Sequence, residues 1–403
     1  MIIPALIFAA TYGIVAIGGL SIVRLDRTGA ALIGASLMVA SGTLSLSEAY
    51  QAINFDTVTL LLGMMIIVVH LRLSGFFGIA TSFIAARAQH PLALLSGVVL
   101  VSGLLSAFLV NDTVCLMLTP LLITVVRRLG RRPLPYLLAL AMASNIGSVA
   151  TLTGNPQNMM IGSLSHIAYG DFAAALAPVA AMGLAAAVAL IGLFYRKEFW
   201  SHATMHGTGL MLHVSRPMLI TSLAATALAI AGFFFGIAPP KVAIVVGAAL
   251  LLYPTKSQRI YREIDWSLLL LFVGLFVVLA GAEKALLTAD VRQAVQGAGL
   301  SSVPMLAMVA AILSNLVSNV PAVLVLAPFI NDLAHPNQSW LVLAMAATFA
   351  GNFTVLGSVA NLIVVEHAKR DGVEIGFWDY FKIGAPLTLA TIAIGIWWLA
   401  SAG

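Results

Sequence analysis

A single acidic residue, Asp112, lies within a long apolar part of the chain and is the first candidate for chemistry. It is the only formal charge between Arg87 and Arg127. A charge in so apolar a setting is costly and marks a functional site by default, and a desolvated carboxyl can bind and release a proton near neutral pH. Asp112 is therefore predicted to be a proton-binding group. The alternative is a structural acid that accepts hydrogen bonds from the amides of a facing helix start.

Two polar motifs accompany this acid, the tripeptide Asn111-Asp112-Thr113 and a longer run that ends in TLTGNPQN at residues 151–158. Gly154 and Pro156 must interrupt a helix there, which frees backbone carbonyls and exposes a new helix start near Gln157. A helix start suits an anion or hydroxyl oxygens, and freed carbonyls suit a cation. The candidate binding residues in this half are Asn111, Asp112, Thr113, Asn145, Thr153, Gly154, Asn155 and Asn158.

Similar motifs recur later in the chain, as SNVP at residues 318–321 and NFTVLGSVAN at residues 352–361. Val320 stands where the first motif has its acid, so the pair of motifs carries one carboxyl. Paired broken helices in corresponding positions of two halves point to a transport site, whereas kinks that only serve helix packing are the alternative. The candidate residues here are Ser318, Asn319, Thr354, Gly357, Ser358 and Asn361.

The remaining reactive side chains give weaker signals. Cys115 lies one helical turn after Asp112 and is expected to be a small core residue, although a thiol could also contact a soft trivalent arsenic or antimony species. His202, His206 and His213 share one loop, but their irregular spacing and the lack of acidic neighbours argue against a metal site. No metal and no cofactor is expected. Because no base and nucleophile are paired, an enzyme is the least favoured class.

The composition decides which elements position these residues. The 403 residues are 61% hydrophobic and 9% charged, with a mean hydropathy of +1.04, whereas a soluble domain carries roughly a quarter charged residues. A membrane-spanning helix needs about 20 apolar residues, and one cysteine excludes disulfides. We predict an all-α polytopic membrane protein, without a cleavable signal peptide, whose spans lie at about 1–23, 28–46, 56–74, 134–150, 172–195, 217–236, 241–253, 265–281, 339–356 and 384–400.

Two further apolar stretches, 91–126 and 303–330, are interrupted by the polar motifs. The piece after each interruption is shorter than the about 17 residues that a crossing requires. Non-helical backbone at membrane depth is tolerated only where it is buried in protein or lines a cavity. Both stretches are therefore predicted to be re-entrant hairpins whose tips meet inside the protein. Two ordinary spans with a small loop are the alternative.

The chain also repeats itself. Ser106 and Asn111 match Ser314 and Asn319 at a spacing of 208 residues, and residues 138–144 match 341–347 at five of seven positions. Each half then has five spans, and an odd number of spans inverts the second half, as in secondary transporters. The predicted organisation is a first repeat at 1–196 with a broken helix at 134–168, a cytoplasmic linker at 197–216, and a second repeat at 217–403 with a broken helix at 339–368. Segments 76–89 and 282–298 are expected to be interfacial helices.

The basic residues fix the expected orientation. If the loop 127–132 is cytoplasmic, then 17 of the 20 Lys and Arg residues fall inside, and only Lys241, Lys284 and Arg292 fall outside. Cytoplasmic loops carry such an excess. The chain is therefore expected in the plasma membrane, the inner membrane of a bacterium, with both termini outside.

The motifs VNDT at 110–113, SNIGSVATLTGNPQN at 144–158, SNVP at 318–321 and LGSVANLIV at 356–364 resemble the ion-transporter superfamily. This superfamily includes arsenite-efflux permeases, D-type sodium/proton antiporters and divalent-anion/sodium symporters, and the resemblance covers nearly the whole chain. It implies two inverted repeats, a homodimer, and an elevator motion of a transport layer past a fixed scaffold. The resemblance places Asn111, Asp112, Thr113, Ser318 and Asn319 at the hairpin tips, and Thr153, Gly154, Asn155, Asn158, Gly357, Ser358 and Asn361 at the breaks.

Departures from the pattern narrow the function. Sodium-coupled dicarboxylate carriers have tips similar to Ser-Asn-Thr, so Asp112 and Val320 favour a proton over paired sodium ions. Neither tip has an Arg or Lys, so a neutral polyhydroxyl such as arsenous acid suits the site better than a dianion. We therefore expect proton-coupled efflux of arsenite or antimonite, with or without an ATPase subunit. The alternatives are a proton- or sodium-coupled carrier of small anions or dicarboxylates, and a passive channel.

Overall fold

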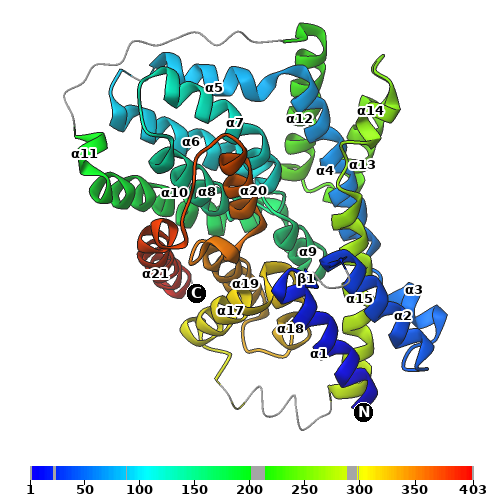
Figure 1. Ribbon diagram of the computed structural model, residues 1–403. Coiled ribbons are helices and arrows are strands. Elements are labelled where there is room, and N and C mark those ends of the chain that lie inside the picture. The colour runs from blue at the N-terminus through cyan, green and yellow to red at the C-terminus, as the bar shows by residue number, and fades with distance from the viewer. Residues whose placement is uncertain are drawn as a thin grey trace.

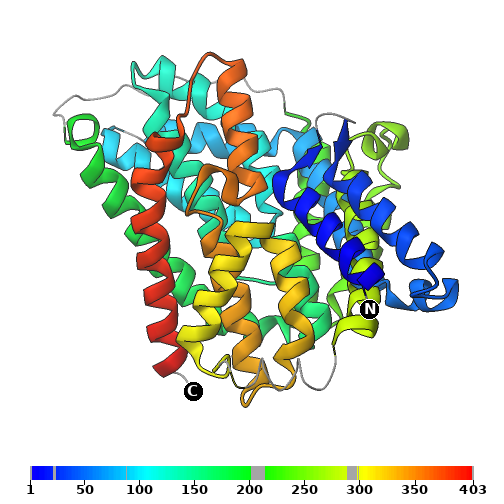
Figure 2. The same ribbon diagram turned by 60° about the horizontal axis from the view of Figure 1, so that its bottom comes forward.

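The computed structural model describes residues 2–20, 24–87, 89–200, 214–287, 297 and 299–401. It is nearly all-helical, and its one sheet in these residues is a short antiparallel pair of two-residue strands, Gly19–Leu20 and Leu25–Asp26. Figures 1 and 2 show a bundle of long helices with shorter helices packed between them. The predicted all-α membrane fold is confirmed.

The first half holds two hairpin helices and a helix that breaks in two. Its elements are α1 (Ile2–Ile17), β1 (Gly19–Leu20), β2 (Leu25–Asp26), α2 (Arg27–Ala40), α3 (Leu46–Ala52), α4 (Phe55–Ser74), α5 (Phe76–Arg87), α6 (Pro91–Phe108), α7 (Asn111–Arg128), α8 (Pro133–Ser148), α9 (Pro156–Ser165), α10 (Tyr169–Phe194) and α11 (Arg196–Phe199). The hairpin is α6–α7, and the broken helix is α8–α9.

The second half repeats this order. Its elements are α12 (Arg216–Phe234), α13 (Pro239–Leu250), α14 (Ser257–Tyr261), α15 (Trp266–Leu286), α17 (Val303–Val317), α18 (Asn319–Ile330), α19 (Pro336–Ala350), the 3-10 turn η2 (Val355–Gly357), α20 (Val359–Arg370) and α21 (Phe377–Ser401). Here α17–α18 is the hairpin and α19–α20 is the broken helix. The two inverted repeats predicted from the sequence are therefore present.

Six helices in the described residues are long and apolar enough to cross a membrane: α4, α6, α10, α12, α15 and α21. Several other predicted spans form shorter helices. For example, α2 has 14 residues and α13 has 12. The predicted span 1–23 ends early, at Ile17, because Gly18 and Gly19 take positive φ angles of 91° and 130° and lead into β1.

The helices form two groups. The straight-helix group consists of α1, α2, α4, α12, α13 and α15, and the hairpin group consists of α6–α10 and α17–α21 (Figure 1). Within the straight-helix group, α4 packs on α13 and α15 packs on α2, so each half supplies one partner to the other. Both contacts are close, since a Cβ on Gly63 would lie 2.4 Å from the Ala243 backbone and one on Gly274 would lie 2.7 Å from that of Ala31.

In the hairpin group, α6 packs on α8 and α17 packs on α19, which repeats the same contact in the two halves. In the first half the backbones approach closely, because a Cβ on Gly147 would lie 2.1 Å from the Gly103 carbonyl oxygen. The corresponding residues of the second half are Ala311 and Ala350. Each hairpin is therefore held against the broken helix that follows it.

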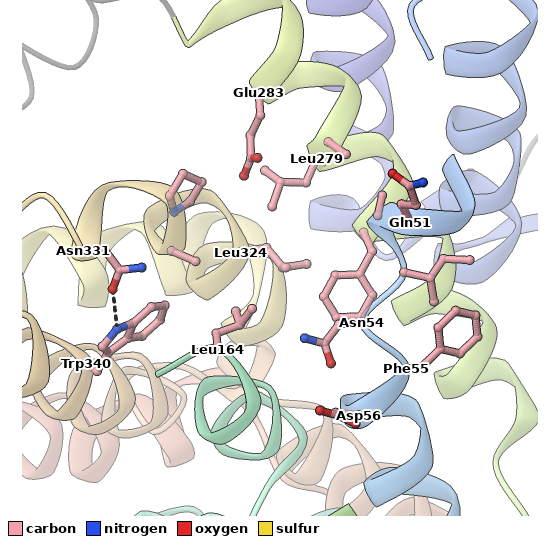
Figure 3. A pocket seen from close by; sticks show the side chains of 16 residues that line it. Gln51, Asn54, Phe55, Asp56, Leu164, Leu279, Glu283, Leu324, Asn331 and Trp340 are labelled. Carbon is pink, nitrogen blue, oxygen red and sulfur yellow. Dashed lines mark hydrogen bonds between the residues drawn. The ribbon is translucent and has the colours of Figure 1, made fainter. Parts of the chain in front are cut away.

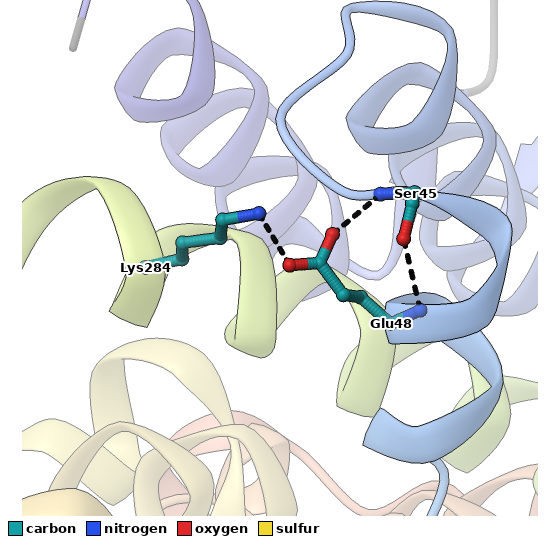
Figure 4. Close-up of polar contacts among 3 residues, drawn as sticks. All are labelled: Ser45, Glu48 and Lys284. Atoms are coloured by element: carbon teal, nitrogen blue, oxygen red, sulfur yellow. Dashed lines mark hydrogen bonds and ion pairs between the residues drawn. The ribbon is translucent and has the colours of Figure 1, made fainter.

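Two ion pairs join the two halves. Arg72 at the end of α4 lies 2.5 Å from Glu263, which precedes α15. Lys284 in α15 lies 2.5 Å from Glu48 of α3, and Ser45 and Glu48 also form a capping box (Figure 4). The Lys284 ammonium and the hydrogen bonds from Ser45 lower the pKa of Glu48 to about 2.

Some predicted segments fall partly outside the described residues. The linker 197–216 is described only at its ends, where α11 and α12 lie, and His202, His206 and His213 lie outside. Of the predicted interfacial helices, 76–89 contains α5, whereas the first part of 282–298 belongs to the end of α15 and most of the rest lies outside.

Candidate functional site

The two hairpin tips are short and differ in backbone geometry. Between α6 and α7 the chain turns through Leu109 and Val110, and the Asn111 amide N–H then donates to the Gly154 carbonyl over 3.0 Å. Between α17 and α18 a single residue, Ser318, turns the chain with a φ of 77°. A positive φ is costly for a residue with a side chain, so the second tip is strained and the first is not.

Asn145, near the end of α8, connects the tips to both halves. Its Oδ1 accepts hydrogen bonds from Asn111 over 3.0 Å and from Ser358 over 3.1 Å. Its Nδ2 donates to the Oδ1 atoms of Asn352 and Asn361 over 2.9 and 3.0 Å. All of these side chains are buried. The first hairpin tip and the second helix break therefore belong to one amide network.

Asn158 and Asn361 occupy matching positions after the two breaks. The Nδ2 of Asn158 donates to the carbonyls of Ser148 and Thr151 over 3.1 and 3.0 Å. The Nδ2 of Asn361 donates to the matching carbonyls of Gly351 and Thr354 over 2.7 and 3.2 Å. Each asparagine thus satisfies carbonyls that the break frees, as buried backbone groups require.

The two breaks also contact each other. Thr348 of α19 accepts hydrogen bonds through Oγ1 from Gln157 over 3.1 Å and from Asn155 over 3.3 Å. Thr348 corresponds to Asn145 in the repeat. In each half, therefore, a residue of the helix before the break bonds to residues at the break of the other half. This crossing explains how two separate motifs form one polar centre.

A small cavity of about 60 Å³ lies where these elements meet. The hairpin tips contribute Asn111, Asp112, Ser318, Asn319, Val320 and Pro321, and the helix starts contribute Pro156, Gln157, Ser358 and Val359. The straight-helix group contributes Val15, Arg27, Leu268 and Leu271. The cavity combines neutral polar groups with one acid and one base.

The two charged residues of this cavity have no partner. Within the described residues, neither the Asp112 carboxylate nor the Arg27 guanidinium makes a hydrogen bond or an ion pair. The carboxylate of a structural acid would be hydrogen-bonded to facing amides, and the described contacts of Asp112 include none. The cavity thus holds two charges that are available to a ligand or a proton.

Three buried amide oxygens lack donors in the described chain, one of them Oδ1 of Asn315 in α17 and the other two at the first tip and after the first break. The Oδ1 atoms of Asn111 and Asn158 have no hydrogen-bond partner in the described chain. The matching atoms of the second half are satisfied, since Asn319 accepts from Ser314 over 2.6 Å and Asn361 accepts from Asn145. Unsatisfied buried acceptors are rare, and hydroxyl groups or a cation would satisfy them.

Of the predicted site residues, five line the cavity, namely Asn111, Asp112, Ser318, Asn319 and Ser358, and the others do not. Thr153 bonds to the hydroxyl of Tyr169 over 2.8 Å, and Cys115 is fully buried in the core. The side chains of Thr113 and Thr354 make no hydrogen bond in the described structure and do not line the cavity. Gly154 and Gly357 serve the backbone, since a Cβ on Gly154 would lie 2.1 Å from the Ser148 carbonyl oxygen.

Sequence reasoning missed several members of the site. Thr348 and Asn352 could have been found, because Thr348 aligns with Asn145 in the repeat and Asn352 begins the second motif. The sequence marks Gln157 as the start of a helix, but not as a member of the site. Arg27 gave no signal, because an arginine beside an apolar run is typical of a loop at the membrane surface. The described residues hold no group of three His, Cys, Asp or Glu that could bind a metal.

A larger cavity of about 620 Å³ opens elsewhere between the two groups. Figure 3 shows Asn54, Asp56 and Glu283 from the straight-helix group facing Leu164, Asn331 and Trp340 from the hairpin group. Asn54 also accepts a hydrogen bond from Ser163 of α9 over 3.2 Å, and Ser163 bonds to Thr57 over 2.6 Å. This cavity lies at the face that the sequence predicts to be extracellular, and it is separate from the polar centre.

The paired hairpins and paired broken helices define a class, the polytopic membrane transporters built from repeats. Residues 12–350 match the family described as citrate transporter (CitMHS). The chain belongs to this family, which is part of the ion-transporter superfamily.

Several relatives are similar over most of the chain. An uncharacterized transporter of Mycobacterium tuberculosis is 30% identical, across 98% of this chain and 96% of its own length. The silicon efflux transporter LSI3 of Oryza sativa subsp. japonica is 28% identical, across 92% of both chains. A Dictyostelium discoideum transporter named arsB is 25% identical, across 92% of this chain and 87% of its own length. These relatives are transporters, so the chain is a membrane transporter.

Among solved structures, the YdaH transporter of Alcanivorax borkumensis superimposes with a TM-score of 0.63. The alignment covers 99% of this chain and 96% of the other at 15% sequence identity. At this identity the likeness concerns the fold alone.

Proposed function

We propose that this transporter exports a small oxyacid, foremost arsenous or antimonous acid, in exchange for protons. The observation that carries the proposal is the unpartnered Asp112 in a small cavity between both hairpin tips and both helix starts. A carboxyl in such a setting can alternate between a protonated and an ionised form. The substrate and the proton would then compete for one site.

The size and chemistry of the cavity support a compact, hydroxyl-rich substrate. Its volume of about 60 Å³ is small, and most of its polar lining is neutral amide and hydroxyl. The acceptor oxygen of Asn111 lacks a donor, and a hydroxyl of an undissociated oxyacid could supply one. Two relatives carry names that fit such substrates, a silicon efflux transporter and a transporter named arsB.

The proposed movement is of the elevator type, with the straight-helix group as the fixed scaffold and the hairpin group as the moving layer. The support is that most of the cavity lining belongs to one group, while the other group supplies a largely apolar wall of Val15, Leu268 and Leu271. Such a wall can slide past the polar centre without leaving hydrogen bonds unpaired. The proposed assembly is a homodimer, and an ATPase subunit is not required for exchange.

A second candidate is transport of small anions or dicarboxylates, coupled to protons or sodium. The observation that favours it is Arg27, a cation in the same cavity. The family description as citrate transporter points the same way.

Uptake into proteoliposomes under imposed pH and sodium gradients separates these candidates. Arsenite accumulation driven by a pH gradient alone, with no effect of sodium, would support the first. Sodium-dependent uptake of a dicarboxylate, without arsenite transport, would refute the first and support the second. Vesicles without protein, and vesicles with the Asp112→Asn variant, serve as controls.

The proposed orientation places both termini outside. Cysteines introduced as Leu129→Cys and Gln258→Cys should react with an impermeant maleimide only from the cytoplasm, and Asn337→Cys only from outside. The natural Cys115 is fully buried and should not react. Labelling of positions 129 and 337 from the same face would contradict the proposed topology.

A further inference from the structure

Arg27 is the first residue of α2 and lies in the straight-helix group, opposite the hairpin tips. The helix start is fixed locally, because Asp26 caps it by accepting a hydrogen bond from the Gly29 amide over 2.7 Å. The guanidinium lies beside the turn before the helix, since a Cβ on Gly18 would be in ordinary contact with Nη2 of Arg27 at 3.6 Å. The arginine is thus positioned at the cavity by its own helix and by the turn before it.

No described acid forms an ion pair with Arg27. Asp26 is engaged as the helix cap. Asp112 lines the same cavity on the hairpin side without bonding to it. Asp265, the cap of α15, accepts a hydrogen bond from the Leu268 amide over 3.0 Å. A partly desolvated guanidinium without a partner is costly, so an anion that enters the cavity gains a favourable partner.

The internal repeat allows Arg27 to be compared with the matching position in the second half. The helix that corresponds to α2 is α13, which begins with Pro239, Pro240 and Lys241, and none of these residues lines the cavity. Asp112 has an uncharged counterpart, Val320. The two charges that break the symmetry of the halves therefore line one cavity, although one belongs to the straight-helix group and the other to the hairpin group.

We propose that Arg27 is a specificity-determining residue that lets the cavity accept an ionised oxyacid or carboxylate in addition to a neutral oxyacid. This inference rests on the proposed function in one respect, that the cavity is where substrate binds. A guanidinium presents paired N–H donors that match the oxygens of a carboxylate or oxyanion. Because Arg27 belongs to the proposed scaffold, selection for substrate charge occurs only in the arrangement that places the hairpin tips beside it.

Ligand-induced stabilisation of the purified full-length chain tests this role. A ligand that binds the folded state raises the unfolding temperature. The probes are arsenate, citrate and phosphate as anions, and arsenite at neutral pH as a neutral oxyacid. The variants are Arg27→Gln, which removes the charge, Arg27→Lys, which keeps it, and Arg24→Gln. Arg24 is an exposed arginine three residues away that does not line the cavity, so it is the matched control.

At least one anion is expected to stabilise the wild-type chain and Arg24→Gln. Its apparent affinity should be about 10- to 100-fold weaker in Arg27→Gln, as for a lost hydrogen bond to a charged group, and intermediate in Arg27→Lys. The effect of arsenite should be the same in all variants. Unfolding temperatures without ligand show whether Arg27→Gln is folded.

Three results would overturn the inference: equal stabilisation of Arg27→Gln by the anions, an equal loss in Arg24→Gln, or no stabilisation of the wild-type chain by any anion. A different result would refute the proposed function. If anions bind through Arg27 while arsenite neither binds nor is transported, the assignment to neutral oxyacids is wrong and the role of Arg27 stands.

Discussion

The two halves of the polar centre share a backbone plan, but their matching asparagines at the tips and after the breaks differ in hydrogen bonding. Asn158 and Asn361 hold matching pairs of carbonyls, yet Oδ1 of Asn361 has a donor and Oδ1 of Asn158 has none. The same difference separates the tip residues Asn319 and Asn111. The first half also carries the acid, whereas the second carries the strained Ser318. We therefore expect the first half to bind the substrate and the second half to support it.

The largest effect is expected at the acid of the first half. Asp112→Asn keeps the shape of the side chain but cannot bind and release a proton, so accumulation of substrate against its gradient should be lost almost entirely. Exchange of substrate across the membrane without a gradient should continue, since exchange requires no net proton movement. Proton flux and substrate exchange are measured on the same purified variant.

Val320→Asn, at the matching position of the second tip, is the control for this change, and it should retain coupling. Full pH-driven accumulation by Asp112→Asn would remove the acid from the mechanism. Reduced yield with intact coupling would show that the acid is structural.

The paired asparagines test the difference in hydrogen bonding. Asn361→Ala removes three hydrogen bonds, and Asn158→Ala removes the two that its amide donates. At about 1 kcal/mol each, the losses in unfolding free energy should be about 3 and about 2 kcal/mol. Transport should fall in both variants by more than expression does.

Thermal unfolding in detergent, with transport per folded molecule, separates the two effects. If Asn158→Ala transports normally while Asn361→Ala does not, the binding role would belong to the second half and the comparison would be reversed.

The strain at the second tip predicts a stabilising substitution. Ser318 has a φ of 77° and its hydroxyl makes no hydrogen bond in the described structure. Glycine adopts this geometry without penalty, so Ser318→Gly should raise the unfolding free energy by about 1 kcal/mol. Val110→Gly at the unstrained first tip, where φ is −55°, should lower stability. An unfolding temperature that falls in Ser318→Gly would show that the hydroxyl, and not the backbone, determines this position.

The smallest effect on transport is expected at the Glu48–Lys284 ion pair, which is not part of either hairpin tip. The pKa of Glu48 is lowered to about 2 in the folded protein, against about 4.3 for an unfolded glutamate. Its stabilising contribution is therefore complete above about pH 4.3 and is lost as the pH falls toward 2. Glu48→Gln should leave transport unchanged at neutral pH and should reduce the loss of stability in acid. A transport defect in this variant would mean that the outer ends of α3 and α15 take part in the cycle.

Much of the fold could be predicted from the sequence, because apolar runs and polar interruptions follow directly from the cost of exposing backbone to lipid. The hairpin predicted at 91–126 lies at 91–128, and the one predicted at 303–330 lies at 303–330. Both helix breaks lie where glycine, proline and asparagine predicted them. These features depend on local sequence and on length.

The assembly of the site could not be predicted in the same way. Asn145 bonds to residues 207 and 216 positions away, and nothing local indicates those partners. Arg27 reaches the cavity because α2 packs on α15 of the other half. A sequence that suggests only a surface arginine cannot report this tertiary contact. The missing donors at Asn111 and Asn158 likewise depend on neighbours that only the folded chain defines.

The shortness of α2 and α13 has a consequence for the surrounding lipid. At 1.5 Å per residue, helices of 14 and 12 residues are about 21 and 18 Å long, whereas the hydrocarbon core of a bilayer is about 30 Å thick. These two helices stand at equivalent places in the two repeats, so the bilayer beside each of them must become thinner or the chain must be covered by its neighbours. Reconstitution in lipids of increasing acyl-chain length should therefore slow transport steadily, with the fastest cycling in the shorter-chain lipids.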